Sequence, residues 1–385
     1  MLGLILGLSI LIGFGIYEYY SSRNYRRQIP TIIHVNGTRG KSSVTRLVAA
    51  GLRAAGYKVI AKTTGSAAIL IYENGREAPI ARYTAPNIKE QVNIIKFAAR
   101  RQVDFLVLEC MAVTPEYQWV VEHKIVNSDI GVITNSRLDH LDVMGPGLKN
   151  VTLSLCNTIP KQGKLFTAEK KTLPLLEKVA TDRKTKVKAV DDSTVSDELI
   201  NKFSYIEHKD NVALALAVCQ ELGVKQEQAL RGMYAMQADV GAAEIFPIKI
   251  GEKPAYFAHS FAANDPESTF ILIDIILQRY KDIKDIILVL NTREDRIFRS
   301  KQIVDSLLDF DFAELILIGQ QVKTIEKYAI RKGLNKKISS LGWVSGHQLE
   351  NYLQNNIKER SLIFGIGNIG GNGGEILEYF KARTR

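Results

Sequence analysis

A glycine-rich loop between a short apolar run and a helical pattern constrains the fold of this chain more than any other feature. The apolar run covers residues 31–35, and the helical pattern places Val44, Leu47 and Leu52 on one face before it ends near Gly56. The loop between them consists of Gly37, Thr38, Arg39, Gly40, Lys41, Ser42 and Ser43. A strand, a glycine loop and a helix in this order predict an α/β domain with a parallel-type sheet and a phosphate-binding turn.

The residue types in this loop suit a bound nucleotide. Glycines let backbone N–H groups point at phosphate oxygens, and the N-terminus of the following helix adds partial positive charge. Lys41 can reach the β- and γ-phosphates, and the Ser42 hydroxyl can ligate Mg²⁺. The full Walker pattern needs another glycine at position 35, where this chain has Val35, so the loop is a shortened version.

Acidic residues follow two further apolar strands. One strand ends in Glu109, and the strand at 130–135 is followed by Asp139, His140 and Asp142. Ligands bind at the carboxyl ends of strands in open α/β sheets, so these side chains are candidates for a Mg²⁺ site or for orienting a phosphate. A surface glutamate and an ordinary capped turn are the simpler interpretations. The chain has no N-K-x-D base-reading motif, which disfavours a GTPase.

The N-terminal segment predicts a membrane anchor. Residues 1–17 carry no charged side chain and would form about 25 Å of helix, slightly short of a hydrocarbon core of about 30 Å. Tyrosines and then arginines follow at Tyr17, Tyr19, Tyr20, Arg23, Arg26 and Arg27. Because the positive charges come after the apolar run, we predict one span that binds membrane lipid and leaves the catalytic domains in the cytoplasm. A buried N-terminal helix is the alternative, and the flanks do not fit a cleaved signal peptide.

Composition narrows the protein class without choosing a partner. The 385 residues suggest two to three domains at about 150 residues each. The net charge of +10 suits an acidic partner, but the chain shows no pattern that favours nucleic acid, and we predict no nucleic-acid partner. Three cysteines without metal spacing exclude a disulfide framework.

The C-terminal third predicts a smaller Rossmann-like α/β domain. Short apolar runs at 286–290, 314–318 and 361–364 alternate with helical stretches, which favours parallel strands. Arg293 and Arg296 follow the first of these strands and could hold substrate carboxylates, although a solvated charged loop fits equally well.

A second glycine motif follows the last predicted strand. Residues 365–370 fit G-x-G-x-x-G, but only fifteen residues follow Gly370, which leaves no room for the rest of a dinucleotide-binding unit. We therefore interpret this segment as a close-approach loop rather than a nicotinamide site.

Several motifs, taken together, resemble the Mur ligase superfamily of ATP-dependent amide-forming ligases. They are V-N-G-T-R-G-K-S-S-V-T-R-L (35–47), K-T-T-G (62–65), P-N-I-K-E-Q (86–91), E-C-M-A-V (109–113), D-H-L-D-V-M-G-P (139–146), F-A-A-N-D (261–265) and G-I-G-N-I-G-G (365–371). Within the superfamily the chain is similar to the CapB/PgsB-type poly-γ-glutamate synthases. The resemblance extends from about residue 31 to 371 and includes the short N-terminal membrane segment.

The resemblance implies roles for individual residues. Ser42 and Glu109 would hold a first Mg²⁺, His140 would hold a second, and Asn135 would lie near the transferred phosphate. Further positions implied by the resemblance are Lys41 for catalysis, Asn211 beside the adenine and Asn264 facing the interdomain cleft. Two departures stand out: the stretch 155–160 lacks the CO₂-modified lysine of many Mur ligases, and Ala242 replaces an arginine.

The resemblance also implies the reaction. ATP would phosphorylate a γ-carboxylate to an acyl phosphate, and the amine of glutamate would attack it to extend poly-γ-glutamate. An enzyme of the same class could instead add another amino acid to a different acceptor. The motifs also leave open an anchored ATPase subunit that energises polymer export and a structural membrane protein with a degenerate site.

These interpretations predict three parts: an anchor at 1–22, an ATP-binding Mur ligase-like domain at 28–240 and a C-terminal α/β ligase domain at 241–385. The expected cofactors are ATP and Mg²⁺, and the expected partners are glutamate and the growing polymer. The resemblance implies an integral-membrane partner subunit, and the sequence leaves homo-oligomerisation open.

Overall fold

The chain divides into two units in the computed structural model, which describes residues 2–65, 68–82, 86–238, 243–261 and 266–384. The first unit comprises Met1–Phe203 and His208–Asp239, and the second comprises Ser204–Glu207 and Val240–Arg385. The short segment Ser204–Glu207 belongs to the second unit, where Ile206 forms an antiparallel bridge with Ala243.

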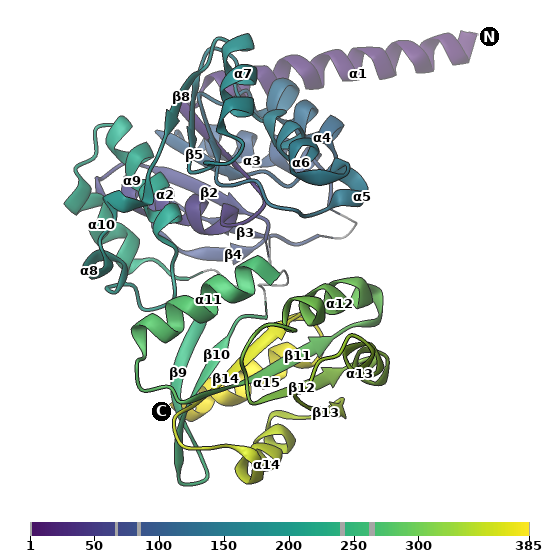
Figure 1. The fold of residues 1–385 in the computed structure, drawn as a ribbon. Helices are drawn as coiled ribbons and strands as arrows, with labels where there is room; N and C mark the ends of the chain where they lie inside the picture. The colour runs from purple at the N-terminus through teal and green to yellow at the C-terminus, as the bar shows by residue number, and fades with distance from the viewer. Residues whose placement is uncertain (1, 66–67, 83–85, 239–242, 262–265, 385) are drawn as a thin grey trace. The chain divides into compact units, whose positions relative to one another are not determined.

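An eight-stranded sheet forms the centre of the first unit (Figure 1). Its strands lie in the order β4-β3-β2-β5-β1-β6-β7-β8. Within this order the strands from β2 across to β8 pair in parallel, whereas β3 and β4 add antiparallel pairs at one edge. The strand bounds are β1 Thr31–Asn36, β2 Val59–Thr63, β3 Ile69–Ile71, β4 Glu77–Pro79, β5 Phe105–Glu109, β6 Ile130–Ile133, β7 Lys164–Thr167 and β8 Lys186–Ala189.

Helices cover both faces of this sheet because each carries an apolar stripe. Helix α2 buries Val44, Leu47 and Leu52 and packs against α9 and α10, whereas α3 contributes Ile94 and Ile95 to a separate buried cluster with β1, β2 and β5. The helix bounds are α1 Leu2–Arg27, α2 Lys41–Ala54, α3 Lys89–Arg100, α4 Pro115–Val120, the π-helix η1 Val121–Val126, α5 Leu141–Met144, α6 Gly147–Cys156, α7 Leu173–Asp182, the 3₁₀-helix η2 Asp192–Thr194, α8 Asp197–Ile200, α9 Lys209–Glu221 and α10 Gln226–Ala235.

Helix α1 projects from the first unit (Figure 1). Its segment Leu4–Arg27 has a mean hydropathy of 1.4, and by length and composition it can cross a membrane. Large apolar side chains from Leu4 to Tyr20 are exposed, so the alternative of a buried N-terminal helix is wrong. Only the last turns pack on the domain, where Tyr25 contacts the buried cluster under α3.

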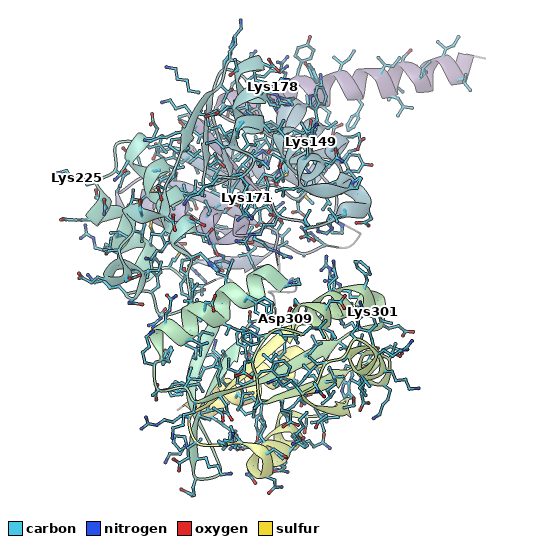
Figure 2. The ribbon with its side chains drawn as sticks, in the orientation of Figure 1. Lys149, Lys171, Lys178, Lys225, Lys301 and Asp309 are labelled. Carbon is cyan, nitrogen blue, oxygen red and sulfur yellow. The ribbon has the colours of Figure 1, made fainter. Side chains whose placement is uncertain are left out.

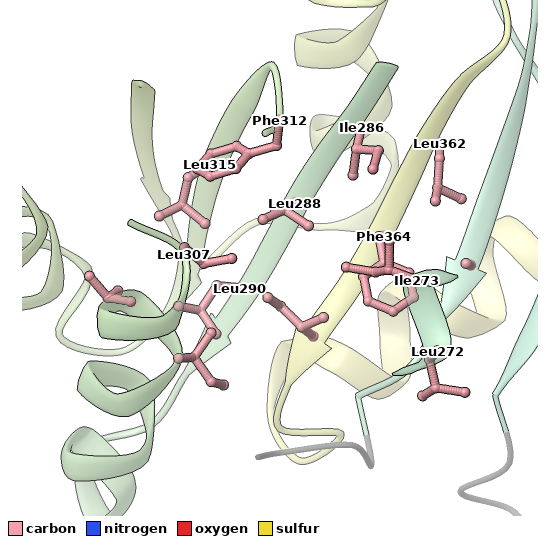
Figure 3. Close-up of a cluster of buried hydrophobic side chains, with 14 of the residues drawn as sticks. Leu272, Ile273, Ile286, Leu288, Leu290, Leu307, Phe312, Leu315, Leu362 and Phe364 are labelled. Carbon is pink, nitrogen blue, oxygen red and sulfur yellow. The ribbon is translucent and has the colours of Figure 1, made fainter. Parts of the chain in front are cut away.

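The second unit is built on a six-stranded sheet with the order β13-β12-β11-β14-β10-β9. The strand bounds are β9 Glu244–Ile250, β10 Lys253–His259, β11 Asp285–Thr292, β12 Glu314–Gly319, β13 Lys337–Gly342 and β14 Ser361–Gly367. The helix bounds are α11 Pro266–Arg279, η3 Glu294–Arg296, α12 Ile297–Ser306, α13 Val322–Arg331, α14 Gly346–Asn356, α15 Asn372–Lys381 and η4 Ala382–Thr384. Figure 3 shows apolar side chains of α11, β11 and β14 meeting on one face of this sheet.

The prediction of parallel strands holds for five of the six strands of this sheet. Strands β10 to β14 pair with their neighbours in parallel, whereas β9 pairs with β10 in antiparallel. Only Gly251 and Glu252 separate β9 from β10, and a two-residue turn allows only an antiparallel hairpin, because a parallel connection needs a dozen or more residues.

Candidate nucleotide and ligase site

The glycine loop lies at the carboxyl end of β1, in the centre of the first sheet. Gly37 and Gly40 have φ values of 136° and 80°, conformations that favour glycine. A Cβ atom at Gly37 would overlap the Thr134 hydroxyl, and one at Gly40 would overlap the Asn211 side-chain oxygen. The loop therefore needs both glycines, for backbone conformation and for space.

The segment after β6 holds the loop in shape. The Asn135 side-chain oxygen accepts hydrogen bonds from the Thr38 hydroxyl at 2.7 Å and from the Arg39 N–H at 3.1 Å. The Asn135 amide also donates to the Arg39 carbonyl at 3.2 Å, and the Thr134 hydroxyl donates to the same carbonyl at 2.5 Å. Asn135 thus contacts the loop directly. Its predicted place near the transferred phosphate stays a prediction.

A buried amide network, which was not predicted from the sequence, anchors the start of the loop. The Asn36 side-chain oxygen accepts from the Gly37 N–H at 2.8 Å. The Asn36 amide donates to the Gln118 side-chain oxygen at 3.0 Å and to the Thr158 hydroxyl at 3.1 Å. An asparagine at the end of an otherwise apolar strand is the one signal that could have revealed it, since a buried amide needs partners.

Lys41 bends back over its own loop. Its Nζ donates to the Gly37 carbonyl at 2.6 Å and to the Thr38 carbonyl at 3.2 Å. Burial lowers the pKa of Lys41, and the nearby Glu109 carboxylate opposes this shift. A phosphate entering the loop would offer stronger, charged acceptors in place of these two carbonyls.

The predicted metal pair is assembled by the register of the sheet. Parallel pairing of β1 with β5 places Val35 opposite Glu109, so the strand end carrying Glu109 lies beside the loop. The Ser42 hydroxyl donates to Glu109 Oε2 at 2.9 Å, and both side chains are buried. The Thr64 N–H donates to the same carboxylate oxygen at 2.6 Å. Serine and carboxylate oxygens beside a phosphate loop fit Mg²⁺, which prefers hard oxygen ligands.

His140 stands at the start of α5 with a φ of 47° and a side chain that is 40% exposed. Its Nε2 lies 3.8 Å from Asp139 Oδ2, and Asp139 also pairs with Arg39 at 3.4 Å. Within the described ranges, no group of three or more His, Cys, Asp or Glu side chains is arranged to hold a metal. The role of His140 as a second metal ligand stays a prediction.

Asn211 lies inside α9 rather than at its end. His208 is the N-cap residue of this helix, so Asn211 is its third residue and does not cap it. Its buried side chain borders Gly40, so this part of α9 lies against the loop. Its contact with an adenine stays a prediction.

A buried lysine on β2, the strand next to that of Glu109, was also not predicted as part of the site. Lys62 on β2 is fully buried, and its Nζ lies 2.6 Å from Glu90, which also binds Arg82 at 2.8 Å. Burial opposes ionisation of Glu90, but hydrogen bonds from Arg82 and Lys62 outweigh it and lower the pKa of that carboxyl. Lys62 and Glu90 fall within two of the motifs that carry the resemblance.

Behind the loop, β1 carries a buried ion pair. His34 Nδ1 lies 2.7 Å from Glu122 Oε2, and both residues are buried. Burial lowers the pKa of His34, but the neighbouring Cys110 and Glu122 side chains outweigh burial and raise that pKa to about 10. The Ser128 N–H and hydroxyl donate to the other Glu122 oxygen, each at 2.9 Å. The pair joins β1 to η1 directly beneath the nucleotide loop.

In the second unit, Arg293 lies over the second glycine loop. A Cβ atom at Gly370 would approach the Arg293 guanidinium at 2.8 Å. Arg293 binds both carboxylate oxygens of Asp295 at 2.9 Å, and Arg296 lies 3.9 Å from the same carboxylate. Both arginine side chains are partly exposed. Asn264 lies outside the described residues.

An asparagine pair fixes this second loop. The Asn291 amide donates to the Asn368 carbonyl at 2.5 Å and to the Gly370 carbonyl at 3.0 Å, and the Asn368 amide donates to the Asn291 carbonyl at 3.3 Å. Asn291 was missed, although its position at the end of an apolar strand was visible in the sequence.

Comparison with known proteins identifies both units. The family model of the Mur ligase middle domain matches residues 35–237, and that of the poly-gamma-glutamate synthase CapB C-terminal domain matches residues 245–383. The capsule biosynthesis protein CapB of Bacillus anthracis is 38% identical over 371 residues, which cover 94% of this chain and 78% of that protein. The PGA synthase CapB of Bacillus subtilis is 36% identical over 383 residues, which cover 97% and 96%.

A solved structure shows the same fold. The bifunctional folylpolyglutamate synthase/dihydrofolate synthase of Yersinia pestis, complexed with AMPPNP and a Mn ion, superimposes with a TM-score of 0.69 at 13% identity. The match covers 94% of this chain and 91% of that one. The expected Mur ligase-like fold is therefore confirmed, and the chain belongs to the CapB family of the Mur ligases.

Proposed function

We propose that this protein is an ATP-dependent ligase that activates a γ-carboxylate and joins it to the amine of glutamate, building poly-γ-glutamate. The observation that carries the proposal is the Ser42–Glu109 pair, held at 2.9 Å beside a glycine loop that ends in Lys41. The CapB relatives, one of them named a PGA synthase, support the polymer as product.

The loop binds the nucleotide and leaves the γ-phosphate open to attack. Its N–H groups and the N-terminus of α2 face the phosphates, and Lys41 exchanges its two carbonyl partners for phosphate oxygens. Ser42 and Glu109 would hold Mg²⁺, which when bound neutralises phosphate charge. The complex of the Yersinia pestis relative with AMPPNP and a Mn ion supports this cofactor pair.

The reaction needs no protein nucleophile. A carboxylate oxygen attacks the γ-phosphorus and ADP leaves, which yields an acyl phosphate. The amine nitrogen then attacks the acyl carbon, the phosphate leaves, and the amine loses a proton. Positioning and charge neutralisation dominate such phosphoryl transfers, and the braced loop with Asn135 supplies positioning.

The second unit supplies candidates for binding the substrate carboxylates. Arg293 and Arg296 would exchange Asp295 for the α-carboxylate of glutamate, because arginine binds carboxylates in bidentate pairs. Asn264, which falls outside the described residues, is the further candidate from the resemblance.

Helix α1 would anchor the enzyme in the membrane with both units in the cytoplasm. Its exposed apolar surface and the arginines after it support this orientation. A polymer that is made in the cytoplasm and used outside needs an exit path, so we include an integral-membrane partner subunit in the proposal.

The test uses detergent-purified full-length protein with Mg-ATP and glutamate. Mass spectrometry should show products spaced by one glutamyl residue, together with ADP, and Lys41→Ala should abolish both. Lys178→Ala, which removes an exposed lysine on α7, is the matched control. ADP release without a product ladder, in detergent and again in native membranes, would contradict the ligase and favour an export ATPase.

A further inference from the structure

A cationic pocket lies where α1 meets the first unit. It has a volume of about 320 Å³ and is lined by Ser22, Arg23, Arg26, Arg27, Lys124, Ile125 and Asn127. Four of these seven side chains carry positive charge, and this lining includes no acidic residue among those that the structure describes. Neither the glycine loop nor any other predicted site residue contributes to it.

One of the four cations is structural. Arg26 donates to the carbonyls of Val126 at 2.8 Å and Asn127 at 2.7 Å, and it pairs with Asp129 at 2.7 Å. The Asp129 carboxylate also accepts from the Ile32 N–H at 2.8 Å. Arg26 therefore fixes the foot of α1 to the sheet and neutralises the neighbouring carboxylate. The positive charges of Arg23, Arg27 and Lys124 remain for a ligand.

Two of these three cations lie beside aromatic rings. Arg23 donates to the Tyr19 hydroxyl at 2.8 Å, and its guanidinium lies 5.3 Å from the centre of the Tyr19 ring. The Lys124 ammonium lies 5.3 Å from the centre of the Trp119 ring, which is 38% exposed. Tyrosine and tryptophan beside basic residues are typical of the membrane–water interface.

The position of the pocket along α1 matches the headgroup layer. The exposed apolar side chains of this helix end at Tyr20. At about 1.5 Å per residue, Arg23 lies roughly 5 Å and Arg27 roughly 10 Å further along the helix axis. The headgroup region on each side of a bilayer is about 5–8 Å thick, so Arg23 lies at the depth of this layer and Arg27 lies just beyond it.

The pocket is separated from the nucleotide loop by the length of the central strands. Arg26 contacts Asp129 and Asn127, which precede β6, and Asp129 binds the start of β1. The glycine loop follows the carboxyl end of β1. An anion in the pocket would therefore lie at the amino ends of the central strands, whereas the proposed phosphate site lies at their carboxyl ends.

We propose that this pocket binds the phosphate of an anionic phospholipid headgroup through Arg23, Arg27 and Lys124. The proposal rests on the membrane anchor proposed above. The polyanionic product is the competing occupant. The phospholipid is favoured because the pocket continues directly from an exposed apolar helix and lies away from the edge where the polymer would be made.

The test measures lipid binding by the full-length protein in a nonionic detergent. Native mass spectrometry would count bound phosphatidylglycerol against phosphatidylcholine of the same chain length. We expect selective binding of one phosphatidylglycerol, and the triple variant Arg23→Gln, Arg27→Gln, Lys124→Gln should weaken it about a hundredfold, at roughly fivefold per charge. The control variant Lys171→Gln, Lys178→Gln, Lys225→Gln removes the same charge from exposed lysines shown in Figure 2 and should bind as the wild type does.

Three results would overturn the lipid site. They are equal binding of both lipids, unchanged affinity in the pocket variant, and displacement of phosphatidylglycerol by equimolar inorganic phosphate or poly-γ-glutamate. Carbonate washing of native membranes tests the anchor separately: a chain that is washed off contradicts the anchor itself, whereas a retained chain without headgroup selectivity contradicts only the pocket. ATP-dependent ligase activity in detergent should be equal in both triple variants.

Discussion

Each unit of this protein carries a glycine loop after a central parallel strand, yet only one of the loops has the side chains of a nucleotide site. In the first unit the loop after β1 is braced by Asn135, and in the second the loop after β14 is braced by Asn291. In both, a side-chain amide from a neighbouring strand end hydrogen-bonds the loop backbone. The backbone design is therefore shared.

The side chains around the two loops differ. The first loop leads into a helix that begins with Lys41 and Ser42, and Ser42 binds Glu109. The second loop lies beside Arg293 and leads into α15, which begins with Asn372. Lysine, serine and glutamate suit a metal-bound triphosphate, and arginine suits a carboxylate. Glycine spacing alone thus predicts a close backbone approach, and the neighbouring side chains decide the ligand.

Removal of Lys41 from the first loop should lower activity more than any other change proposed here. Lys41→Ala should lower ligase and ATPase rates by about 10³-fold, since the loop loses the lysine proposed to contact the phosphates. Steady-state assays would measure this loss. Lys178→Ala should retain wild-type rates. A Lys41 variant with more than about a tenth of wild-type activity would contradict the assignment of the first loop.

The strands beneath the two loops offer the next test. Strand β1 carries His34, which forms a buried ion pair with Glu122, whereas β14 contributes Phe364 and Ile366 to an apolar core. His34→Gln should destabilise the first unit by about 3–5 kcal/mol, because it leaves Glu122 buried without its charged partner. Urea unfolding followed by Trp119 fluorescence in a Trp343→Phe background would report the first unit separately, since these are the only two tryptophans.

The same pair predicts a pH dependence. The folded pKa of His34 is raised to about 10, above an unfolded value of about 6.5. Its contribution to stability is therefore complete below pH 6.5 and is lost as the pH rises through 10. The unfolding free energy of the first unit should fall between pH 7 and 10, and this slope should diminish in His34→Gln. Equal slopes in the two proteins would contradict a charged His34.

Adding a methyl group to each loop compares them directly. Gly40→Ala should cost about 1–3 kcal/mol and abolish binding of an ATP analogue, because φ is positive and the methyl group overlaps Asn211. At Gly370 the methyl group would meet the movable end of Arg293 at 2.8 Å. Gly370→Ala should therefore keep stability and ATP affinity and raise only the KM for glutamate. Calorimetric titration would measure the affinity for the ATP analogue, and unfolding curves would measure the stability of each variant.

Arg293→Ala should give the smallest effect. Charged hydrogen bonds are worth about 1.5–3 kcal/mol, so the KM for glutamate should rise about tenfold or more while kcat and the KM for ATP change little. Arg331→Ala, on α13, is the matched control. An equal fall in kcat without a change in the KM for glutamate would exclude a role in substrate binding.

Local patterns predicted much of the fold and the core of the site. The strand, loop and helix around Lys41 and the strand that ends at Glu109 are present, and parallel pairing brings their ends together. Strand β13 was not predicted because its sequence, KISSLG, is polar and lies at a sheet edge. The antiparallel pairing of β9 with β10 was not predicted, because strands of hairpins and of parallel sheets have similar apolar content.

Contacts between distant segments could not be read from the chain. The pairs His34–Glu122 and Lys62–Glu90 join residues far apart in sequence, and nothing local marks the partners. The approach of Arg293 to Gly370 has the same origin, since it follows from the pairing of β11 with β14. Such long-range polar contacts depend on tertiary packing rather than on spacing along the chain.

In the proposed reaction, the energy of ATP passes through an acyl phosphate formed at the first loop. The most direct measurement supplies glutamate labelled with ¹⁸O in its γ-carboxylate as the only acceptor and donor, and then analyses the released phosphate by mass spectrometry. We expect one ¹⁸O atom in each phosphate that accompanies a new amide bond, and none when Lys41→Ala replaces the wild type. Phosphate that carries oxygen only from ATP and water would contradict it and indicate ATP hydrolysis without carboxylate activation.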